Sequence, residues 1–308
     1  MSDKPPVTNL KSPEERRTCR EERRQQQRDA NPARAQKMHT ARLDYQNLLT
    51  EQPAPPPTVN VGCSGWFYWH WRGVFYPEQM PTKEWFPTYR KSFSTVELNA
   101  PFYSWPTINA VKGWMRQVGN EPFIYTVKVN ELITHAKHFI GTKTLVRDFQ
   151  HIADLLGPRM GCFLFQLPPS YDYSPARLKA IISQMDPARR NVVEFRHESW
   201  WNENVYEAFR EHGIIFCSCS APRLPDKLVL TSPEIYIRFH GKAGWYRHHY
   251  TDSELSEWLA RVRGSGAERV WAYFNNDFEG HAIDNARNFQ KMLETPHKTT
   301  SEKQYEPS

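Results

Sequence analysis

The sequence predicts an α/β fold of the (β/α)8 barrel type, and three observations support this prediction. Eight short apolar segments have the length and composition of buried strands. Amphipathic stretches with helical spacing follow most of these segments, so strands and helices alternate along the chain. The last inward positions of several strands are polar, which is typical of a closed barrel whose strand ends share one mouth.

The order and spacing of the elements favour a barrel over an open sheet, because eight strands occur within about 250 residues. The predicted strands lie at residues 59–64, 94–99, 123–130, 161–167, 191–196, 214–218, 235–240 and 269–275. The predicted helices lie near residues 83–91, 107–118, 143–156, 174–185, 201–212, 253–263 and 280–294. Residues 219–234 contain three prolines and no helical period, so we expect the sixth helix to be missing or irregular.

The chain divides into a polar N-terminal extension, a barrel and a short tail. Residues 1–57 form the extension and end in a proline-rich linker. Residues 58–296 form the barrel, and residues 297–308 are expected to be a disordered tail. We expect the extension to be dispensable for folding, because the barrel closes its own sheet.

Within the extension, two segments have different character. Ser12, Pro13 and Glu15 have the spacing of a helix start with a capping box. Residues 16–28 have no apolar face, so we expect a loosely ordered segment there. Residues 35–49 have apolar side chains at helical spacing and are expected to dock on the barrel.

Composition indicates a cytoplasmic protein with no membrane span. No apolar run reaches the length of a membrane helix, and the first residues lack the pattern of a secretory signal. Four of the five cysteines lie in apolar strands, where we expect buried fillers rather than disulfides. The sequence does not indicate an oligomeric state.

The net charge of +6 gives only weak support for a nucleic-acid partner. Residues 1–57 hold eleven Lys and Arg against eight Asp and Glu, so three of the six excess charges lie outside the barrel. Duplex-binding faces usually cluster their basic side chains, and the other three charges are spread over the barrel sequence. A basic arm at residues 16–28 is disfavoured, because Glu14, Glu15, Glu21 and Glu22 would repel phosphate.

The candidate site follows from the period of two along each strand, which places alternate side chains on the inner face. Glu194 and Arg196 share such a face, and so do Arg238 and His240. The same rule selects one or two polar residues on four other strands: Glu97, Asn99, Lys128, Gln166 and Asn275. These side chains converge on one pocket if the barrel closes. The alternative is a buried ionic network that fills the barrel.

Aromatic residues follow several strands and are expected to form the rim of the pocket. Trp66, Tyr103 and Trp200 follow strands one, two and five, and His135 follows strand three. Aromatic rings on loops can stack on sugars or bases. The pattern therefore favours a ligand that contains a ring, although each aromatic residue could instead pack between a loop and a helix.

We interpret the constellation as the site of an enzyme that uses acid–base chemistry on a small sugar-containing anion, such as a sugar phosphate or a nucleotide. Glu194 or Glu97 would be the general base or acid, with His240 as its partner. Lys128, Arg196 and Arg238 would neutralise the anion. One alternative is a module that binds nucleic acid or a nucleotide without turnover.

A second alternative is a metal-dependent nuclease or isomerase. Glu97, Glu194, His135 and His240 offer oxygen and nitrogen ligands. The predicted pocket also contains three cationic side chains against two carboxylates, which disfavours a divalent ion. We therefore expect no metal, and no motif indicates another cofactor.

Several motifs resemble those of the YecE-like proteins, which are also called the domain of unknown function 72. The resemblance covers most of residues 59–294, in family order. It rests on Gly62-Cys63-Ser64-Gly65-Trp66, Gly73-Val74-Phe75-Tyr76-Pro77, Val96-Glu97-Leu98-Asn99, Val127-Lys128, Thr134-His135, Phe165-Gln166-Leu167-Pro168-Pro169, Glu194-Phe195-Arg196-His197, Arg238-Phe239-His240-Gly241 and Tyr273-Phe274-Asn275-Asn276. The resemblance implies a (β/α) barrel with a suggested likeness to apurinic-endonuclease and xylose-isomerase barrels, and it implies no established reaction.

Overall fold

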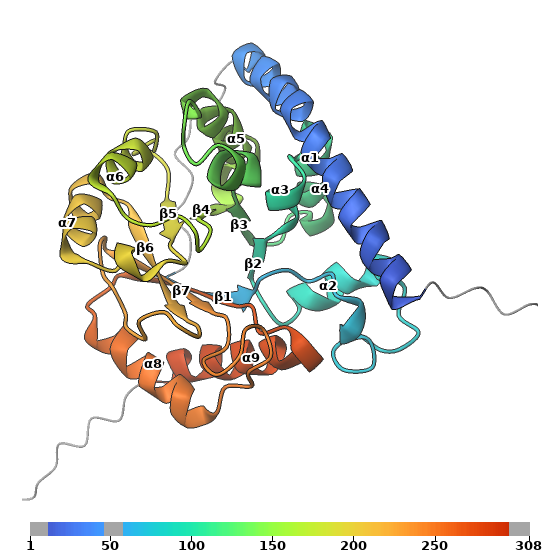
Figure 1. The fold of residues 1–308 in the computed structure, drawn as a ribbon. Coiled ribbons are helices and arrows are strands. Elements are labelled where there is room, and N and C mark those ends of the chain that lie inside the picture. The colour runs from blue at the N-terminus through green and yellow to red at the C-terminus, as the bar shows by residue number, and fades with distance from the viewer. Residues whose placement is uncertain (1–11, 46–57, 296–308) are drawn as a thin grey trace, which may run out of the picture.

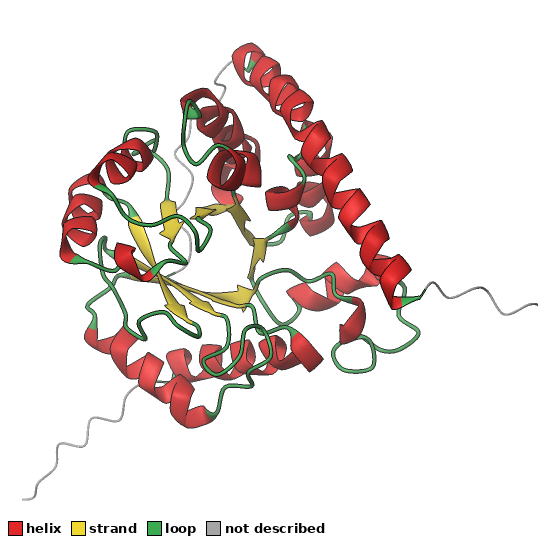
Figure 2. Cartoon of the chain, in the orientation of Figure 1, coloured by secondary structure: helices red, strands yellow, loops and turns green. Residues whose placement is uncertain are grey.

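Eight parallel strands form a nearly closed barrel with helices around its outside, which confirms the predicted fold class (Figures 1 and 2). The computed structural model describes residues 12–45 and 58–295. Hydrogen-bonded neighbours follow the order β1-β8-β7-β6-β5-β4-β3-β2. The strands are β1 (Val59–Cys63), β2 (Thr95–Leu98), β3 (Ile124–Lys128), β4 (Met160–Gln166), β5 (Asn191–Glu194), β6 (Ile215–Ser220), β7 (Glu234–Phe239) and β8 (Arg269–Phe274).

The helices agree closely with the amphipathic stretches of the sequence, and no described helix is both long and apolar enough to cross a membrane. They are α1 (Pro13–Asp44), α2 (Trp85–Arg90), α3 (Ala100–Tyr103), α4 (Ile108–Val118), α5 (Lys143–Leu156), α6 (Pro175–Ile182), α7 (Glu203–His212), α8 (Asp252–Gly264) and α9 (His281–Glu294). A π-helix at Leu132–Ala136 follows β3. Residues 221–233, between β6 and β7, contain no helix, which confirms the expected loss of the sixth one.

A tyrosine hydroxyl joins β1 and β2, the two strands at the ends of the hydrogen-bonded order. The hydroxyl of Tyr89 accepts a hydrogen bond from the backbone N–H of Cys63 at 2.9 Å and donates one to the carbonyl of Thr95 at 3.0 Å. The strands approach so closely that a Cβ at Gly62 would lie 2.4 Å from the Thr95 carbonyl oxygen. Glycine is therefore required at this position of the seam.

Polar groups inside the barrel are buried and hydrogen-bonded to one another. The hydroxyl of Tyr273 lies 2.7 Å from Oγ1 of Thr95 and 3.0 Å from Oγ1 of Thr126. On the neighbouring strand β7, the hydroxyl of Tyr236 donates to Oε2 of Glu97 at 2.5 Å. Because buried polar atoms are costly without partners, these bonds fix the side chains that support the mouth.

In its described part, residues 12–45, the N-terminal extension forms a single helix, α1, of 32 residues. Ser12 and Glu15 make the predicted capping box. Residues 16–28 were expected to be loosely ordered, and the structure instead places them within α1. The capping box fixes one end of this segment and the docked turns that follow fix the other, so it needs no apolar face of its own.

The second half of α1 packs on the barrel beside α3 and α5, as expected for the apolar spacing after residue 35 (Figure 1). Ala35 and Met38 are buried, with 2% and 1% of their surface exposed. The side chain of Asn31 accepts a hydrogen bond from the backbone N–H of Trp105 at 2.9 Å and donates one to the carbonyl of Tyr103 at 3.2 Å. The predicted linker and C-terminal tail, and the last docking residues after position 45, lie outside the described residues.

No disulfide bond joins the cysteines of the described residues, and the four in strands are buried as the sequence predicts. Cys217 and Cys219 face the same side of β6 with their sulfur atoms 3.8 Å apart. Burial raises the pKa of Cys217 and Cys162 well above the ordinary thiol range. These thiols are therefore protonated fillers of the barrel wall at neutral pH.

Candidate functional site

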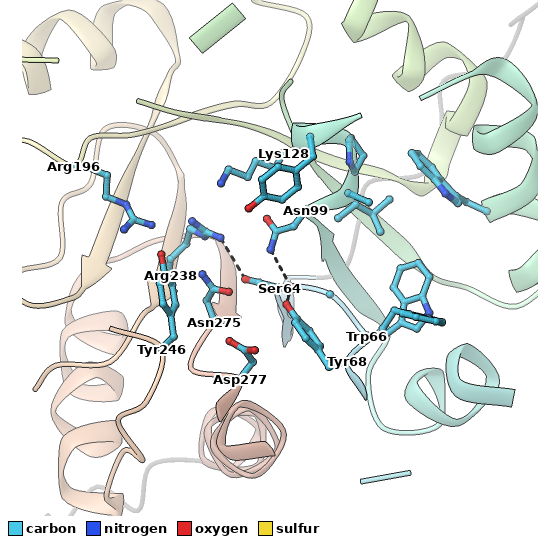
Figure 3. A pocket seen from close by; sticks show the side chains of 17 residues that line it. Ser64, Trp66, Tyr68, Asn99, Lys128, Arg196, Arg238, Tyr246, Asn275 and Asp277 are labelled. Atoms are coloured by element: carbon cyan, nitrogen blue, oxygen red, sulfur yellow. Dashed lines mark hydrogen bonds between the residues drawn. The ribbon is translucent and has the colours of Figure 1, made fainter. Parts of the chain in front are cut away.

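A cavity of about 630 Å³ opens at the carboxyl ends of the strands. Cavities of this size bury small ligands, and barrel enzymes keep their chemistry at this end. Figure 3 shows polar side chains from several strands pointing into the space between them. Seven of the residues predicted from the sequence line the cavity, namely Trp66, Asn99, Tyr103, Lys128, Arg196, Arg238 and Asn275.

Arg238 forms the floor of the cavity and joins the two predicted acidic residues. It donates from Nη2 to Oε1 of Glu97 at 2.6 Å and from Nη1 to Oε2 of Glu194 at 2.5 Å. All three side chains are almost completely buried, with at most 1% exposed. Such a buried pair of carboxylates is tolerated only because one guanidinium bridges it.

Arg196 and His240 complete the contacts of Glu194. Arg196 makes an ion pair with Oε1 of Glu194, and Nε2 of His240 lies 3.2 Å from the same oxygen. Burial would raise the pKa of Glu194, but Arg196 and Arg238 together hold it well below its usual range. Burial and the charge of Arg196 lower the pKa of His240 well below its usual range. At neutral pH, Glu194 is therefore an anion and His240 is neutral.

The structure thus contains both arrangements that the sequence left open. A buried ionic network fills the barrel end, and an open cavity lies directly above it. Glu97, Glu194 and His240 have no exposed surface, so the arginines that they contact lie between them and the cavity.

Lys128 lies at the end of β3 with its amine on the cavity. Its Nζ donates to Oε1 of Gln166 at 2.7 Å and sits 3.9 Å from the centre of the Phe102 ring. No carboxylate among the described residues lies within ion-pair distance of this amine. Burial, together with the charge of Arg238, lowers the pKa of Lys128 to about 7. The amine therefore exchanges its proton near neutral pH.

Two asparagine side chains line opposite sides of the cavity (Figure 3). Asn99 donates from Nδ2 to the carbonyl of Ser64 at 2.9 Å, and Nδ2 of Asn275 lies 3.1 Å from Nδ1 of His240. The Oδ1 atom of Asn99 is buried and has no hydrogen-bond partner in the described part of the chain. An unsatisfied acceptor beside a cavity suits a ligand hydroxyl or N–H as donor.

Asp277 also lines the cavity and was not selected from the sequence. Its Oδ2 lies 3.2 Å from Nε2 of His70, and burial nevertheless raises the pKa of Asp277 above its usual value. Figure 3 shows Asp277 on the side of the cavity opposite Lys128. It follows β8 in the loop, two residues after Asn275, so the same strand-end rule extended into the loops would have found it.

Two predicted rim residues do not reach this cavity. Trp200 is fully buried, because its ring stacks on Phe195 at 4.1 Å and its indole N–H donates to the carbonyl of Tyr171 at 2.7 Å. His135 packs edge-on against Phe102 and lines a separate space of about 300 Å³ between α1 and the π-helix. Neither residue lines the site cavity, and the ligand contacts expected for both stay predictions.

A second cavity of about 930 Å³ adjoins the first. Arg196 and Tyr246 line both cavities and separate them. Arg196 stacks over the ring of Trp245 at 4.5 Å. Gln166, which holds Lys128, lines the second cavity rather than the first, and Arg223 lies on its wall.

The described residues contain one cluster with metal-ligand geometry, formed by Glu194, Cys217 and Cys219 within 4.8 Å of one another. The carboxylate of this cluster already carries two arginine contacts. Burial also keeps the Cys217 thiol protonated, whereas a metal needs the thiolate. This donor set therefore does not suit a divalent metal.

Comparison with known proteins identifies the family. The family model described as "Protein of unknown function DUF72" matches residues 60–308. The chain belongs to the DUF72 family. It is 25% identical over 272 residues to UPF0759 protein YunF of Bacillus subtilis, and the match covers 77% of this chain and 95% of YunF.

Solved structures of the same family share the DUF72 barrel. A DUF72 family protein from Thermotoga maritima is 29% identical, with a TM-score of 0.70 over 78% of this chain and all of that one. A DUF72 family protein from Enterococcus faecalis has a TM-score of 0.64 at 19% identity, covering 78% of this chain and 96% of that one, which shows the fold alone. The family match begins at residue 60, so it does not include α1.

Proposed function

We propose that this DUF72 protein is an enzyme that moves a proton to or from an anionic, sugar-containing substrate, with Lys128 as the principal acid–base group. The observation that carries the proposal is a buried amine facing a cavity, held by an amide rather than a carboxylate, with a pKa of about 7. A pKa near the working pH gives the best compromise between holding and transferring a proton.

Asp277 is the partner of Lys128 in this proposal. Burial raises the pKa of Asp277, and burial lowers that of Lys128, so the two values shift toward each other from opposite sides. Groups whose environments tune them in this way are candidates for acid and base on two faces of one substrate. Figure 3 shows these two side chains facing the cavity from opposite walls.

Arg196 is the proposed contact for the anionic group of the substrate. Two of its nitrogen atoms contact Glu194 and His240, and Nη1 has no hydrogen bond to any described residue. A guanidinium held from behind in this way presents its outer edge to a ligand without reorganising. Arg238 is committed to two carboxylates, so we assign it to positioning.

The sequence assigned proton transfer to Glu194, Glu97 and His240, and that assignment stays a prediction. Their contacts favour a supporting role, because Glu194 is a weak base when two arginines lower its pKa. The orphan acceptor on Asn99 and the rings of Trp66 and Tyr103 would recognise the hydroxyl and ring faces of a sugar. Four cysteines buried in strands without a disulfide bond favour a reducing compartment such as the cytosol.

Incubation of the full chain in D₂O with a panel of sugar phosphates and nucleotides tests the proposal. Mass spectrometry would follow both product formation and the incorporation of solvent deuterium. We expect at least one compound to react, and the rate to fall by about 100-fold or more in Lys128→Met, the usual size of an acid–base contribution. Lys137→Met, which removes an exposed lysine from the segment that follows β3, is the matched control.

Two results would contradict the proposal. One is binding of panel compounds without any turnover or exchange, which would favour a binding module. The other is equal turnover by wild type and Lys128→Met, which would move the chemistry to the residues beneath the cavity.

A further inference from the structure

The first turns of α1 extend beyond the barrel and carry many of the basic residues of this helix. Residues 12–18 and 20–26 are all exposed, although the helix continues without interruption into its docked half. Helix propensity alone stabilises a polar segment of this kind only weakly, so folding does not account for the composition of its exposed surface.

Four arginines of this segment lie on one face of the helix, at spacings of three and four residues, and we call them the arginine stripe: Arg16, Arg20, Arg23 and Arg24. The same spacing continues to Asn31, Ala35 and Met38, which are buried against the barrel. The arginine stripe therefore continues the face that α1 turns toward the barrel.

The acidic residues of the segment lie on the other side of the helix. Glu14, Glu15, Glu21 and Glu22 fall roughly opposite the stripe at 100° per residue. The repulsion expected from the sequence between these acids and phosphate therefore does not apply to the face that carries the stripe. Charge is segregated on this helix, and the positive side continues the face that packs on the barrel.

The arginine stripe reaches the wall of the site cavity. The guanidinium of Arg24 lies 5.2 Å from the centre of the Tyr103 ring, and Tyr103 lines the cavity. Two neighbouring arginines are paired: Arg17 pairs with Glu21, and Arg28, which follows the stripe on the barrel-facing side, pairs with Glu131. Arg20, Arg23 and Arg24 have no carboxylate within ion-pair distance among residues 12–45 and 58–295.

Positive and aromatic side chains continue across the mouth. Beyond Tyr103, the site cavity contains Lys128 and then Arg196 and Tyr246, which it shares with the second cavity. Arg223 lies on the far wall of that second cavity. Tyr246 and Phe67, which are 41% and 53% exposed, are the most open rings along this path. The two cavities and the stripe together form a track longer than a single sugar phosphate needs.

We propose that the anionic, sugar-containing substrate of this site is a single-stranded nucleic acid, which contacts the arginine stripe and places one unpaired nucleotide in the site cavity. The inference rests on the proposed function and names its substrate class. Alternating cations and aromatic rings are the means by which proteins bind unpaired strands, because the cations contact phosphates and the rings stack on bases. The stripe spans about 12 Å along the helix axis, enough for about three phosphates of a strand.

Fluorescence anisotropy tests the inference on the full chain, with labelled single strands of ten thymidine or ten uridine nucleotides. The stripe variant is Arg20→Gln, Arg23→Gln and Arg24→Gln combined. The control is Lys91→Gln, Lys179→Gln and Lys291→Gln combined, which removes exposed lysines near the C-terminal ends of α2, α6 and α9. Both variants lower the formal net charge from +6 to +3, so a nonspecific effect of charge would be equal in the two.

We expect the stripe variant to bind about 10- to 100-fold more weakly at 50 mM salt, and the slope of log K against log salt to become shallower by about 2. The control should retain the wild-type slope. Tyr246→Ala should weaken oligonucleotide binding and leave the affinity for a heparin fragment unchanged, because heparin has no bases to stack.

Equal weakening in both charge variants, absence of oligonucleotide binding by wild type, or equal binding of heparin and oligonucleotide would each overturn the inference. Anisotropy does not depend on turnover, so the proposed function can fail while strand binding persists. Conversely, turnover of a sugar phosphate that depends on Lys128, without strand binding, would retain the proposed function and remove only the nucleic-acid substrate.

Discussion

Arg238 determines how the charged residues of the barrel are arranged, because it is the only described side chain that contacts both Glu97 and Glu194. Two carboxylates buried side by side would otherwise repel each other and become protonated. The guanidinium between them offsets this repulsion, and Arg196 and Arg238 together hold the pKa of Glu194 well below its usual range. Arg196 then contacts Glu194 from the cavity side, where its side chain keeps about 10% of its surface exposed.

These contacts predict unequal stability losses for the two arginines. Arg238→Met leaves two buried carboxylates without their bridging cation, so we expect the free energy of unfolding to fall by about 3–5 kcal/mol. Arg196→Met leaves Glu194 with Arg238 and His240, so we expect a loss of less than about 2 kcal/mol. Urea denaturation of both variants measures the difference. A larger loss in Arg196→Met would show that Arg196, rather than Arg238, stabilises the network.

At the residue scale, the period of two along strands identified most of the side chains that meet at the mouth. It selected Lys128, Arg196, Arg238 and the residues beneath them without knowledge of the fold. It could not predict the low pKa of Lys128, which depends on burial and on Arg238 from a strand more than 100 residues away. Asp277 was missed because it belongs to a loop. Trp200 was misplaced because its ring fills the space beside Phe195.

At the scale of elements, α1 is the part of the chain that the sequence described least well. The sequence predicts two separate segments here, because Pro32 and the polar residues before it interrupt the apolar period. The structure forms one helix through both halves, because Pro32 lies on its exposed side. Water can there donate to the backbone carbonyl that proline, which has no N–H, leaves without a partner. The loop between β6 and β7 was predicted correctly, because its prolines exclude a helix directly.

The docking of α1 can be tested with one substitution. Met38→Asp places a carboxylate in the buried face of α1, so we expect the helix to detach and the protein to lose at least about 2 kcal/mol of stability, the value of one buried methionine. The barrel should remain folded, as its sheet closes without α1. Hydrogen exchange should show loss of protection in α1 alone. Met38→Leu is the control, and collapse of the whole barrel would make α1 part of the core.

At the scale of the whole molecule, the strands of the barrel support a cavity whose rim is formed by loops. The strands bring residues from separate parts of the chain to the cavity floor, and Tyr89 holds the seam between β1 and β2. The loops above the floor supply much of the aromatic rim, and α1 contacts α3 at the carbonyl of Tyr103. The barrel class was predictable because strand-like and helix-like segments alternate along the chain. The two cavities were not, since they depend on how loop side chains pack.

The central claim is that Lys128 exchanges its proton near neutral pH. It is tested most directly by NMR of the full chain with ¹³C-labelled lysine, following each Cε signal from pH 5 to pH 11. Lys128→Arg assigns the signal, because arginine keeps the charge and removes only that resonance. The structure predicts that the Lys128 signal titrates with a pKa of about 7. A Lys128 signal that stays protonated up to pH 9 would contradict the assignment of this amine as the acid–base group.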